Sequence, residues 1–430
     1  MSTFNIITLG CKVNQYESEA VEELFIQKGH KKAKENADIY VINTCTVTNM
    51  SDRKSRQMIS KARKDNPQAI IAVMGCYSQV KPEEVAKIKG VDIVLGSRNK
   101  ENVVELCEEI LENKGALDKI IAPSESKTFE ELQISNQSEM TRAYIKIQDG
   151  CNMYCSYCLI PYARGNIVSR EIPDIVSESQ RLADNGFKEI VLTGIHVASY
   201  GKDFNEDISL IDVIEAVASV NGIERIRLSS MEPRHITREF LERMKATGKA
   251  CDHFHLSLQS GSDKILKAMN RKYDKDIYRQ KVNLIRDVFP NAGITTDIIV
   301  GFPGESEENH KETMDFVNDI KFSKTHLFKF SPREGTRAAK MSEQVDGNTK
   351  KVRLHELAKI EEINRNKFLE KQIGKTLSVL FETGSDIKGY KSGYSTNYLR
   401  VSVDCDVDVN DIRDVLITDV IEDDLIGKIL

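Results

Sequence analysis

Apolar, β-branched runs alternate with amphipathic stretches over the first part of the chain. Strand-like runs cover 4–9, 38–43, 69–74 and 91–95, and helix-like stretches cover 17–28, 52–64, 82–89 and 101–113. Alternation of this kind is typical of a parallel sheet with crossover helices. We therefore predict an α/β protein in which residues 1–135 form an N-terminal open parallel α/β sheet.

The same alternation continues through residues 136–365. Six strand-like runs, each followed by a helix-like stretch, occupy 143–148, 189–193, 225–229, 253–259, 295–300 and 326–330. Six such units predict a central, partial (β/α)6 barrel, which places its chemistry at the carboxyl ends of the parallel strands. The polar segment 115–141 is interpreted as a linker between the two parts.

The last part of the chain has a different pattern. A charged helix is predicted at 352–371, and short β-like runs follow at 376–382, 398–403 and 415–420. Glycines separate the first of these runs from the next. Short strands with glycine turns favour a small C-terminal β-barrel over residues 366–430.

Composition narrows the class of protein. The chain has 430 residues, of which 40% are hydrophobic and 30% are charged, so we expect two or three globular domains. It has no long apolar run and no basic leader, which predicts a cytoplasmic protein without a membrane partner. Its nine cysteines are then expected to be reduced thiols rather than a disulfide framework.

Basic residues are concentrated locally, although the net charge is −5. Six basic residues stand against two acidic ones over 51–65, and nine stand against three over 321–353. Such clusters are compatible with nucleic-acid binding or with a solvated helix face, and both readings stay open. The candidate RNA contacts are Arg53, Lys54, Arg56, Arg333 and Arg337, with Lys388, Lys391 and Arg400 in the C-terminal part.

Three cysteines follow the first strand of the predicted barrel. Cys151, Cys155 and Cys158 are separated by three and then two residues. Thiolates are soft ligands that hold iron–sulfur clusters, and three of them leave one iron of a four-iron cube for another ligand. A structural zinc site would need a fourth ligand, and the next cysteine, Cys251, is far away in the sequence.

A second set of three cysteines falls at strand ends in the N-terminal part. Cys11, Cys45 and Cys76 each follow a predicted strand. The carboxyl ends of parallel strands share one edge of a sheet, so these thiols should converge there. Gly10 and Gly75 allow tight turns beside two of them. We expect a second three-thiolate site.

These motifs resemble those of known enzymes. The spacing Cys-x3-Cys-x-aromatic-Cys, with Tyr157 as the aromatic residue, resembles the radical S-adenosylmethionine (SAM) superfamily. The stretches TLGCKVNQYESE at 8–19 and NTCTVTN at 43–49 resemble the N-terminal domain of the methylthiotransferases. The sequences of these stretches are most similar to those of the branch that acts on N6-threonylcarbamoyladenosine in tRNA. Lys12 and Val13 fit neither the isopentenyladenosine branch nor the branch that modifies ribosomal protein S12.

The resemblance implies two [4Fe–4S] clusters, each with three cysteine ligands. The cluster on Cys151, Cys155 and Cys158 would cleave SAM to a radical that abstracts hydrogen from C2 of the adenine. The cluster on Cys11, Cys45 and Cys76 would deliver sulfur, and a second SAM would supply the methyl group. The product would be the 2-methylthio nucleoside at tRNA position 37, next to the anticodon. The implied partners are tRNA, an electron donor such as flavodoxin or ferredoxin, and a sulfur source.

The resemblance also assigns candidate SAM contacts and a TRAM-like RNA-binding role for the C-terminal barrel. Each polar residue after a strand could equally be an ordinary turn. The candidate SAM-binding residues are Tyr157, Thr193, Gly194, Glu232, Ser257, Gln259, Arg271 and Gly301.

Two alternatives remain open from the sequence. The target could be isopentenyladenosine in tRNA or ribosomal protein S12. From another class, the chain could be a non-catalytic iron–sulfur or zinc RNA-binding protein.

Overall fold

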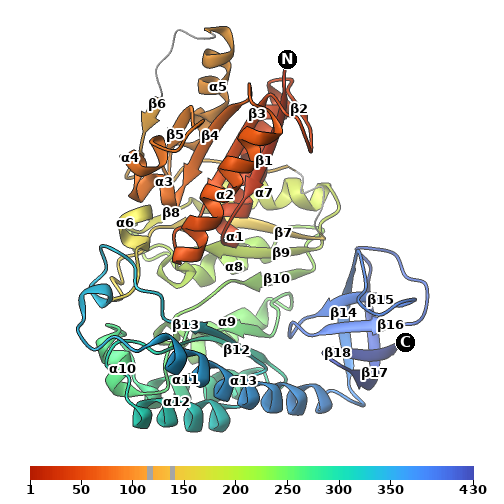
Figure 1. Ribbon diagram of the computed structural model, residues 1–430. Helices are drawn as coiled ribbons and strands as arrows, with labels where there is room; N and C mark the ends of the chain where they lie inside the picture. The colour runs from red at the N-terminus through yellow and green to blue at the C-terminus, as the bar shows by residue number, and fades with distance from the viewer. Residues whose placement is uncertain (114–119, 136–140) are drawn as a thin grey trace.

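The computed structural model describes residues 1–113, 120–135 and 141–430 (Figure 1). Its N-terminal part is a six-stranded sheet in the order β2-β1-β3-β4-β5-β6, in which every pair is parallel. The strands are β1 (Thr3–Thr8), β2 (Lys31–Lys32), β3 (Ile39–Thr44), β4 (Ile70–Gly75), β5 (Ile93–Leu95) and β6 (Ile120–Ala122).

Apolar residues explain why the centre of this sheet forms. All residues of β3 and β4 are buried, as expected of strands covered on both faces. The covering elements are α1 (Lys12–Gln27), α2 (Asn49–Asp65), α3 (Cys76–Val80), α4 (Pro82–Ala86), η1 (Lys100–Asn102) and α5 (Val103–Glu112). The α/β class is confirmed, but the sequence patterns missed β2 and β6.

The central part is an arc of six parallel strands in chain order. Its two sheets, β10-β9-β7-β8 and β11-β12-β13, are linked by isolated parallel bridges such as Met231 to Leu256. The arc consists of β7 (Arg142–Asp149), β9 (Glu189–Gly194), β10 (Arg225–Leu228), β11 (His253–His255), β12 (Gly293–Val300) and β13 (Lys324–Lys329). A short strand, β8 (Val168–Ser169), pairs antiparallel with β7.

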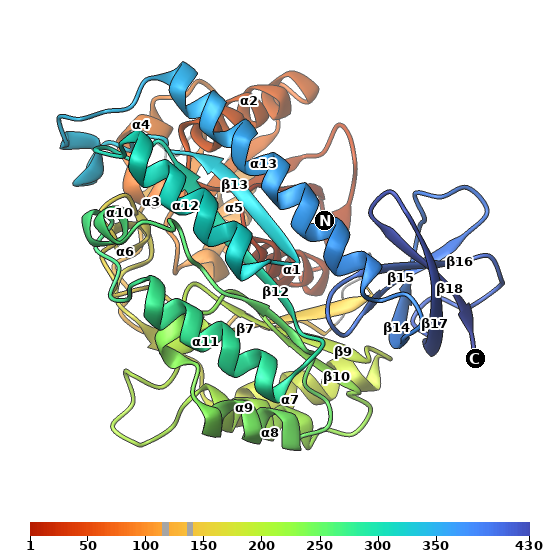
Figure 2. The same ribbon diagram turned by 90° about the horizontal axis from the view of Figure 1, so that it is seen from below.

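Helices cover the outside of this arc and give it the form of a partial barrel (Figures 1 and 2). The predicted strand at 253–259 is too long, because β11 ends at His255. Beyond it, among the described residues, only Leu256 and Gln259 form isolated bridges, with Met231 and Ile298. The helical elements are α6 (Ile160–Arg164), α7 (Ile172–Asp184), η2 (Val197–Ser199), α8 (Leu210–Ala218), η3 (Pro233–His235), α9 (Arg238–Ala246), α10 (Asp263–Ala268), α11 (Lys275–Val288), α12 (Glu307–Ile320) and η4 (Ala338–Lys340).

A long helix, α13 (Gly347–Glu370), runs beside α12 and leads to the C-terminal domain (Figure 2). That domain is a closed five-stranded barrel in the order β14-β15-β16-β18-β17. The sequence patterns missed β15 and β18. The strands are β14 (Thr376–Glu382), β15 (Lys391–Ser395), β16 (Arg400–Val403), β17 (Ile412–Ile421) and β18 (Asp424–Ile429).

The C-terminal barrel is attached at the N-terminal ends of the central strands. Arg142, the first residue of β7, pairs with Glu382 at 2.7 Å. Arg225, the first residue of β10, donates to the Tyr394 carbonyl at 3.0 Å. The opposite, carboxyl ends of the central strands are therefore left to the N-terminal sheet and its loops. None of the described helices is long and apolar enough to cross a bilayer.

The segment predicted as a linker is partly built into the fold. Among its described residues, β6 extends the N-terminal sheet. Glu130 is buried and pairs with Lys100 at 2.7 Å, while Leu132 and Ile134 belong to the core of the central barrel. Residues 115–119 and 136–140 of the predicted linker lie outside the described residues.

A fully buried group of charges joins the N-terminal sheet to the central barrel. The Oε1 atom of Glu17, on α1, lies 2.8 Å from Lys146 on β7, 2.8 Å from Arg164 on α6 and 3.2 Å from Lys100 on η1. Asp149, at the end of β7, pairs with Lys146 at 2.9 Å and Arg164 at 3.1 Å. Buried charges persist only when they are paired in this way.

We expect Glu17→Gln to destabilise the protein strongly. It would remove the carboxylate shared by three buried cations, and breaking a buried ion pair costs about 3–5 kcal/mol. The urea midpoint, followed by circular dichroism, should fall. The matched control Glu171→Gln changes an exposed residue and should alter stability by no more than about 0.5 kcal/mol.

The pH dependence gives a second readout of the same substitution. Burial alone would raise the pKa of Glu17, but Arg164, Lys100 and Lys146 outweigh it and hold the pKa below its ordinary value. Stability from this group is then present above about pH 4, the unfolded value, and is lost as the pH falls further. The acid limb of stability should be shallower in Glu17→Gln; an identical limb would contradict this assignment.

Candidate active site

The three N-terminal cysteines meet at the carboxyl edge of the N-terminal sheet. Thr44 of β3 and Gly75 of β4 are paired in register, and Cys45 and Cys76 directly follow them. Cys11 follows β1 as the residue that precedes α1. The expected convergence of these residues at one sheet edge is therefore present in the fold.

The glycine turn at position 10 brings the first cysteine against the second. Gly10 has φ +108°, and a Cβ atom added there would lie 2.7 Å from the Cβ of Cys45. Asn14 holds the same turn, since its Nδ2 donates to the carbonyls of Leu9 at 2.8 Å and Thr44 at 3.0 Å. Sequence reasoning missed Asn14, although it lies in the stretch that carries the family resemblance.

Asn14 also links this edge to the buried charges. Its Oδ1 accepts from Arg164 at 2.7 Å and lies 3.6 Å from the Sγ of Cys11. Helix α3, which begins at Cys76, packs against α6, which ends at Arg164. The N-terminal thiols thus lie next to the helix that follows the second cysteine set.

The second set occupies the loop after β7, which is held by residues that follow α10. Asn270 donates to the Tyr154 carbonyl at 2.9 Å, and Arg271 donates to the Sγ of Cys155 at 3.4 Å. The ring of Tyr157 packs edge-to-face on Phe302 at 6.4 Å, inside the core beneath the loop. Asn270 is a further residue that sequence reasoning missed.

Burial governs the acidity of these thiols in the metal-free protein. It raises the pKa of Cys76 and Cys158 to about 12, and it also raises the pKa of Cys45 and Cys151. Neighbouring cysteines raise these values further, so the thiols of each set lie within electrostatic reach of one another. Metal binding would displace their protons.

A buried carboxylate lies beside the loop cysteines. Glu232, which is 2% exposed, accepts from Arg234 at 2.7 Å through Oε1, while its Oε2 has no hydrogen-bond partner among the described residues. The Oγ of Ser229 is likewise buried with no partner in the described part of the chain. Orphaned buried atoms of this kind mark places where a ligand supplies the missing hydrogen bond.

The other candidate SAM residues line the same strand ends. Thr193 is buried, and Gly194 approaches Gln148 so closely that an added Cβ would lie 2.8 Å from its carbonyl oxygen. Ser257 accepts a hydrogen bond from Tyr273 through its carbonyl, and Gln259 has a left-handed φ of 73°.

Gly301 is positioned differently from the expected open approach to an adenine. Its φ is +70°, and the stem of Lys350 from α13 packs on it, since an added Cβ would lie 2.2 Å from Lys350 Cγ. An adenine could contact this glycine only if the Lys350 side chain moved aside.

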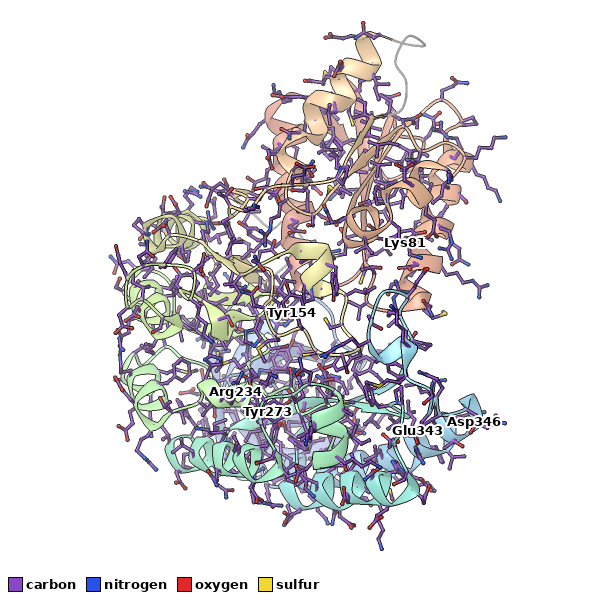
Figure 3. All side chains as sticks on the ribbon, turned by 90° about the vertical axis from the view of Figure 1, so that its left-hand side faces the viewer. Lys81, Tyr154, Arg234, Tyr273, Glu343 and Asp346 are labelled. Carbon is purple, nitrogen blue, oxygen red and sulfur yellow. The ribbon has the colours of Figure 1, made fainter. Side chains whose placement is uncertain are left out.

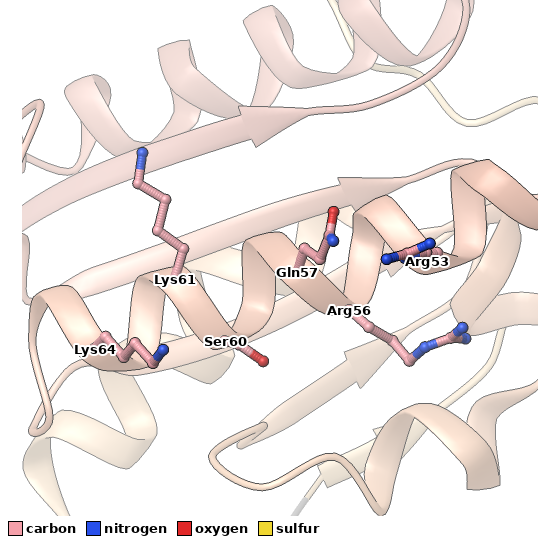
Figure 4. A pocket seen from close by; sticks show the side chains of 6 residues that line it. All are labelled: Arg53, Arg56, Gln57, Ser60, Lys61 and Lys64. Carbon is pink, nitrogen blue, oxygen red and sulfur yellow. The ribbon is translucent and has the colours of Figure 1, made fainter.

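The basic residues on α2 form one face around a shallow hollow of about 450 Å³ (Figure 4). Arg53, Lys54 and Arg56 are all exposed. Arg56 donates to the Tyr77 hydroxyl at 3.0 Å, which fixes part of this face. The hollow is lined by Arg53, Arg56, Gln57, Ser60, Lys61 and Lys64.

Arg333 has a different position from that expected of an RNA contact. It is 4% exposed, and its guanidinium donates to Asp52 at 2.6 Å and to Thr46 at 2.8 Å. The guanidinium therefore ties the loop after β13 to α2 instead of facing solvent. Arg337 is exposed and donates to the Tyr154 carbonyl at 3.3 Å.

The basic residues of the C-terminal barrel have acidic neighbours. Lys391 lies 3.7 Å from Asp406, and Arg400 pairs with Asp386. Lys388 is exposed. These three residues lie on the domain that is attached at the far end of the central strands.

Several contacts join the N-terminal sheet to the segment that follows β13. Lys81, after α3, pairs with Glu334 at 2.8 Å, and Asn49 donates to the Pro332 carbonyl at 3.1 Å. Figure 3 views this side, with Tyr154 and Arg234 near the middle and Lys81 above them. We refer to this junction, where the loops of the N-terminal sheet meet the segments that follow β7 and β13, as the mouth.

Comparison with known proteins gives the family. Residues 145–317 match the radical SAM superfamily, and residues 3–96 match the uncharacterized protein family UPF0004. The chain is 39% identical over 406 residues to the threonylcarbamoyladenosine tRNA methylthiotransferase MtaB of Bacillus subtilis, covering 93% of this chain and 90% of the relative. The chain belongs to the radical SAM tRNA methylthiotransferases. The predicted family and enzyme class are confirmed.

Other relatives show the breadth of the likeness. The tRNA-2-methylthio-N(6)-dimethylallyladenosine synthase of Natranaerobius thermophilus is 41% identical, over 87% of this chain and 85% of the relative. The structure of the radical SAM methyltransferase TsrM from Kitasatospora setae matches with a TM-score of 0.58 at 14% identity, covering 76% of this chain and 75% of that chain. That structural match supports the fold alone.

SAM and [4Fe–4S] clusters are the cofactors of this methylthiotransferase family. The donor chemistry fits them, because two groups of three cysteines lie at strand ends beside unsatisfied polar atoms. In the described part of the chain, no three His, Cys, Asp or Glu side chains surround a single metal ion. Each cysteine of a cluster binds a different iron, so the sulfurs need not converge on one point.

We expect Arg333→Met to lower stability rather than act through RNA. It would leave Asp52, which is 7% exposed, without its buried partner, at a cost of about 3–5 kcal/mol. Thermal unfolding should shift downward, while Arg337→Met at an exposed site should shift it little. Weaker RNA binding at unchanged stability would contradict this structural role.

Proposed function

We propose that this methylthiotransferase converts N6-threonylcarbamoyladenosine, next to the anticodon of tRNA, to its 2-methylthio derivative. The observation that supports the proposal is the packing of α3, which begins at Cys76, against α6, which follows the loop of Cys151, Cys155 and Cys158. Relatives named for this reaction, at 39% and 41% identity over most of the chain, support the substrate. The aromatic C2–H bond is inert to acid–base chemistry near neutral pH, which accounts for the need for a radical.

The two cysteine sets are assigned separate clusters. Cys151, Cys155 and Cys158 hold the cluster that binds SAM, and Cys11, Cys45 and Cys76 hold the auxiliary cluster. When bound, these cofactors supply the radical, the inserted sulfur and the methyl group. The chain itself anchors the loop through the ring of Tyr157, which packs on Phe302, and Arg271 directs a positive charge at Cys155.

The SAM contacts follow from the groups at the strand ends. The orphaned Oε2 of Glu232 supports a bond to the SAM amino group, because an ammonium is the donor that a buried carboxylate needs. Thr193 and Gly194 end the strand beside it. Ser257 and Gln259 are assigned to the ribose side, and Gly301 is assigned to the adenine side, where Lys350 must give way.

The tRNA backbone is assigned to the basic face of α2. Arg53, Lys54 and Arg56 would contact phosphates there, because exposed basic side chains position a nucleic acid without reading its sequence. Arg337 lies nearer the mouth. Lys388, Lys391 and Arg400 of the C-terminal barrel are assigned a secondary part, since two of them are already paired with acidic residues.

The remaining partners follow from the chemistry. Reductive cleavage of SAM requires an electron donor such as flavodoxin or ferredoxin, and each turnover consumes a sulfur atom that must be replaced from a sulfur source. We place the enzyme in the cytoplasm, because that compartment contains tRNA and is reducing enough to keep iron–sulfur clusters reduced.

A second candidate substrate is favoured by one specific comparison. A relative that is 41% identical is named a tRNA-2-methylthio-N(6)-dimethylallyladenosine synthase. Nucleoside analysis of tRNA from a strain that lacks this gene separates the two targets. We expect 2-methylthio-threonylcarbamoyladenosine to disappear and 2-methylthio-isopentenyladenosine to persist. The reverse result would identify isopentenyladenosine as the substrate.

We expect Gly10→Ala to remove the auxiliary cluster. An alanine Cβ would lie 2.7 Å from the Cys45 Cβ and would displace that cysteine from its neighbours. Iron after anaerobic reconstitution should fall from about eight to about four per chain. SAM cleavage should persist, because the loop cysteines are unaffected.

Gly29→Ala is the matched control for this substitution. Gly29 has a similar positive φ of +85° but nothing within 4 Å of an added Cβ, so it carries the backbone strain without the clash. It should retain about eight irons. If both variants lost iron equally, strain would be the cause and the assignment of Cys45 to a cluster would lose this support.

A further inference from the structure

We infer that Lys202 and Arg234 form a carboxylate-binding pair that recognises the threonyl carboxylate of the modified adenosine. This inference rests on the proposed function and names the part of the substrate that distinguishes it. The threonylcarbamoyl group ends in a free carboxylate, whereas an isopentenyl group is wholly apolar. An enzyme that selects between them needs a cationic site at the mouth and near the loop cysteines.

Arg234 has N–H donors that the described residues leave unused. Its Nε donates to Glu232 Oε1 at 2.7 Å, and its Nη2 lies 3.8 Å from the sulfur of Met153, on the cysteine loop. A thioether is a weak acceptor, and a guanidinium carries five N–H donors. The side chain is 40% exposed, and Figure 3 shows it on the same side of the molecule as Tyr154 of the cysteine loop.

Lys202 supplies a second cation beside it. Its Nζ lies 3.3 Å from His235 Nε2, and within the described chain no carboxylate comes within 4.0 Å of it. His235 in turn lies 3.5 Å from Glu232 Oε2. Lys202 and Arg234 are therefore linked by a chain of contacts: Lys202 contacts His235, His235 lies near Glu232, and Glu232 accepts from Arg234.

The charges in this group do not balance without an anion. Burial lowers the pKa of His196 to about 3 and of His235 to about 4, so both rings are neutral near pH 7. Lys202 and Arg234 then face the single carboxylate of Glu232. The group therefore carries an excess positive charge, and a carboxylate is the anion that matches a guanidinium geometrically.

Two carboxylates could enter the mouth: the threonyl group of the RNA and the methionyl group of SAM. The methionyl carboxylate of SAM would bind the iron that the three loop cysteines leave without a protein ligand. It is therefore expected next to Cys155 and Arg271, on the cysteine loop. Lys202 and Arg234 are exposed at the rim, which is where an RNA base enters. The position of the pair favours the threonyl carboxylate.

The test compares two synthetic anticodon stem-loops that differ in one group. One carries threonylcarbamoyladenosine and the other carries its methyl ester, which keeps the shape and removes the charge. With the reconstituted enzyme, we expect kcat/KM to favour the acid by about tenfold or more, as a charge-assisted bond allows. Lys202→Met and Arg234→Met should each bring the ratio toward one.

The ratio is internal to each variant, so a partly inactive preparation still reports it. Lys202→Met is the safer variant, because Lys202 is exposed and has no carboxylate partner in the described structure. Arg234→Lys keeps the charge and should keep most of the preference. Arg238→Met is the matched control, since Arg238 is exposed on α9 and pairs only with Glu242 and Asp287 among the described residues.

The possible outcomes distinguish a failure of this inference from a failure of the proposed function. An acid-to-ester ratio that stays at the wild-type value in Lys202→Met and Arg234→Met would overturn the inference alone. A raised KM for SAM in these variants, with the ratio unchanged, would assign the pair to the methionyl carboxylate and overturn it as well. If the wild-type enzyme modified neither RNA, the proposed function would fall first.

Discussion

The buried charges between the N-terminal sheet and the central barrel hold the architecture together. Glu17 comes from one part of the molecule and Asp149 from the other, and Arg164 contacts both carboxylates. Neither part can move away without leaving charges unpaired in a space without water, which costs several kcal/mol per ion. The two parts therefore behave as one unit, and the distance between the two cysteine sets is set by this interface.

The same interface determines which end of the barrel is open to RNA. Residues at the start of α2, Asn49 and Asp52, contact the segment that follows β13 at the carboxyl end of the arc. The C-terminal barrel is attached at the opposite ends of the strands through residues such as Arg142 and Arg225. An RNA that reached both the mouth and the C-terminal barrel would have to extend along the side of the molecule. The basic face of α2 lies beside the mouth and requires no such reach, because Asn49 at the start of α2 contacts the loop after β13.

Much of this fold could be predicted from the sequence because long buried strands and amphipathic helices leave a clear period. The strands that were missed lack a clear alternation of apolar and polar residues. For example, β2 has two residues, and β15 is rich in serine and glycine. The cysteines could be found because their spacing is a chemical constraint. Asn14, Asn270 and the partners of Glu17 could not, since those contacts join distant segments. Arg333 was misjudged because a basic run does not reveal which of its members is buried.

The two cysteine sets are supported by different physical means, and this difference suits different tasks. Cys45 and Cys76 directly follow β3 and β4, which are paired at the centre of the N-terminal sheet. The close approach of Gly10 leaves the Cys45 side chain no space to shift. Cys155 lies on an irregular loop that is held by side chains, with Arg271 as its cationic neighbour. A sheet edge would hold three cysteine ligands rigidly, which would suit a cluster that supplies sulfur. A loop beside a cation and an unsatisfied carboxylate leaves room for a charged ligand to bind and leave, as SAM must in every turnover.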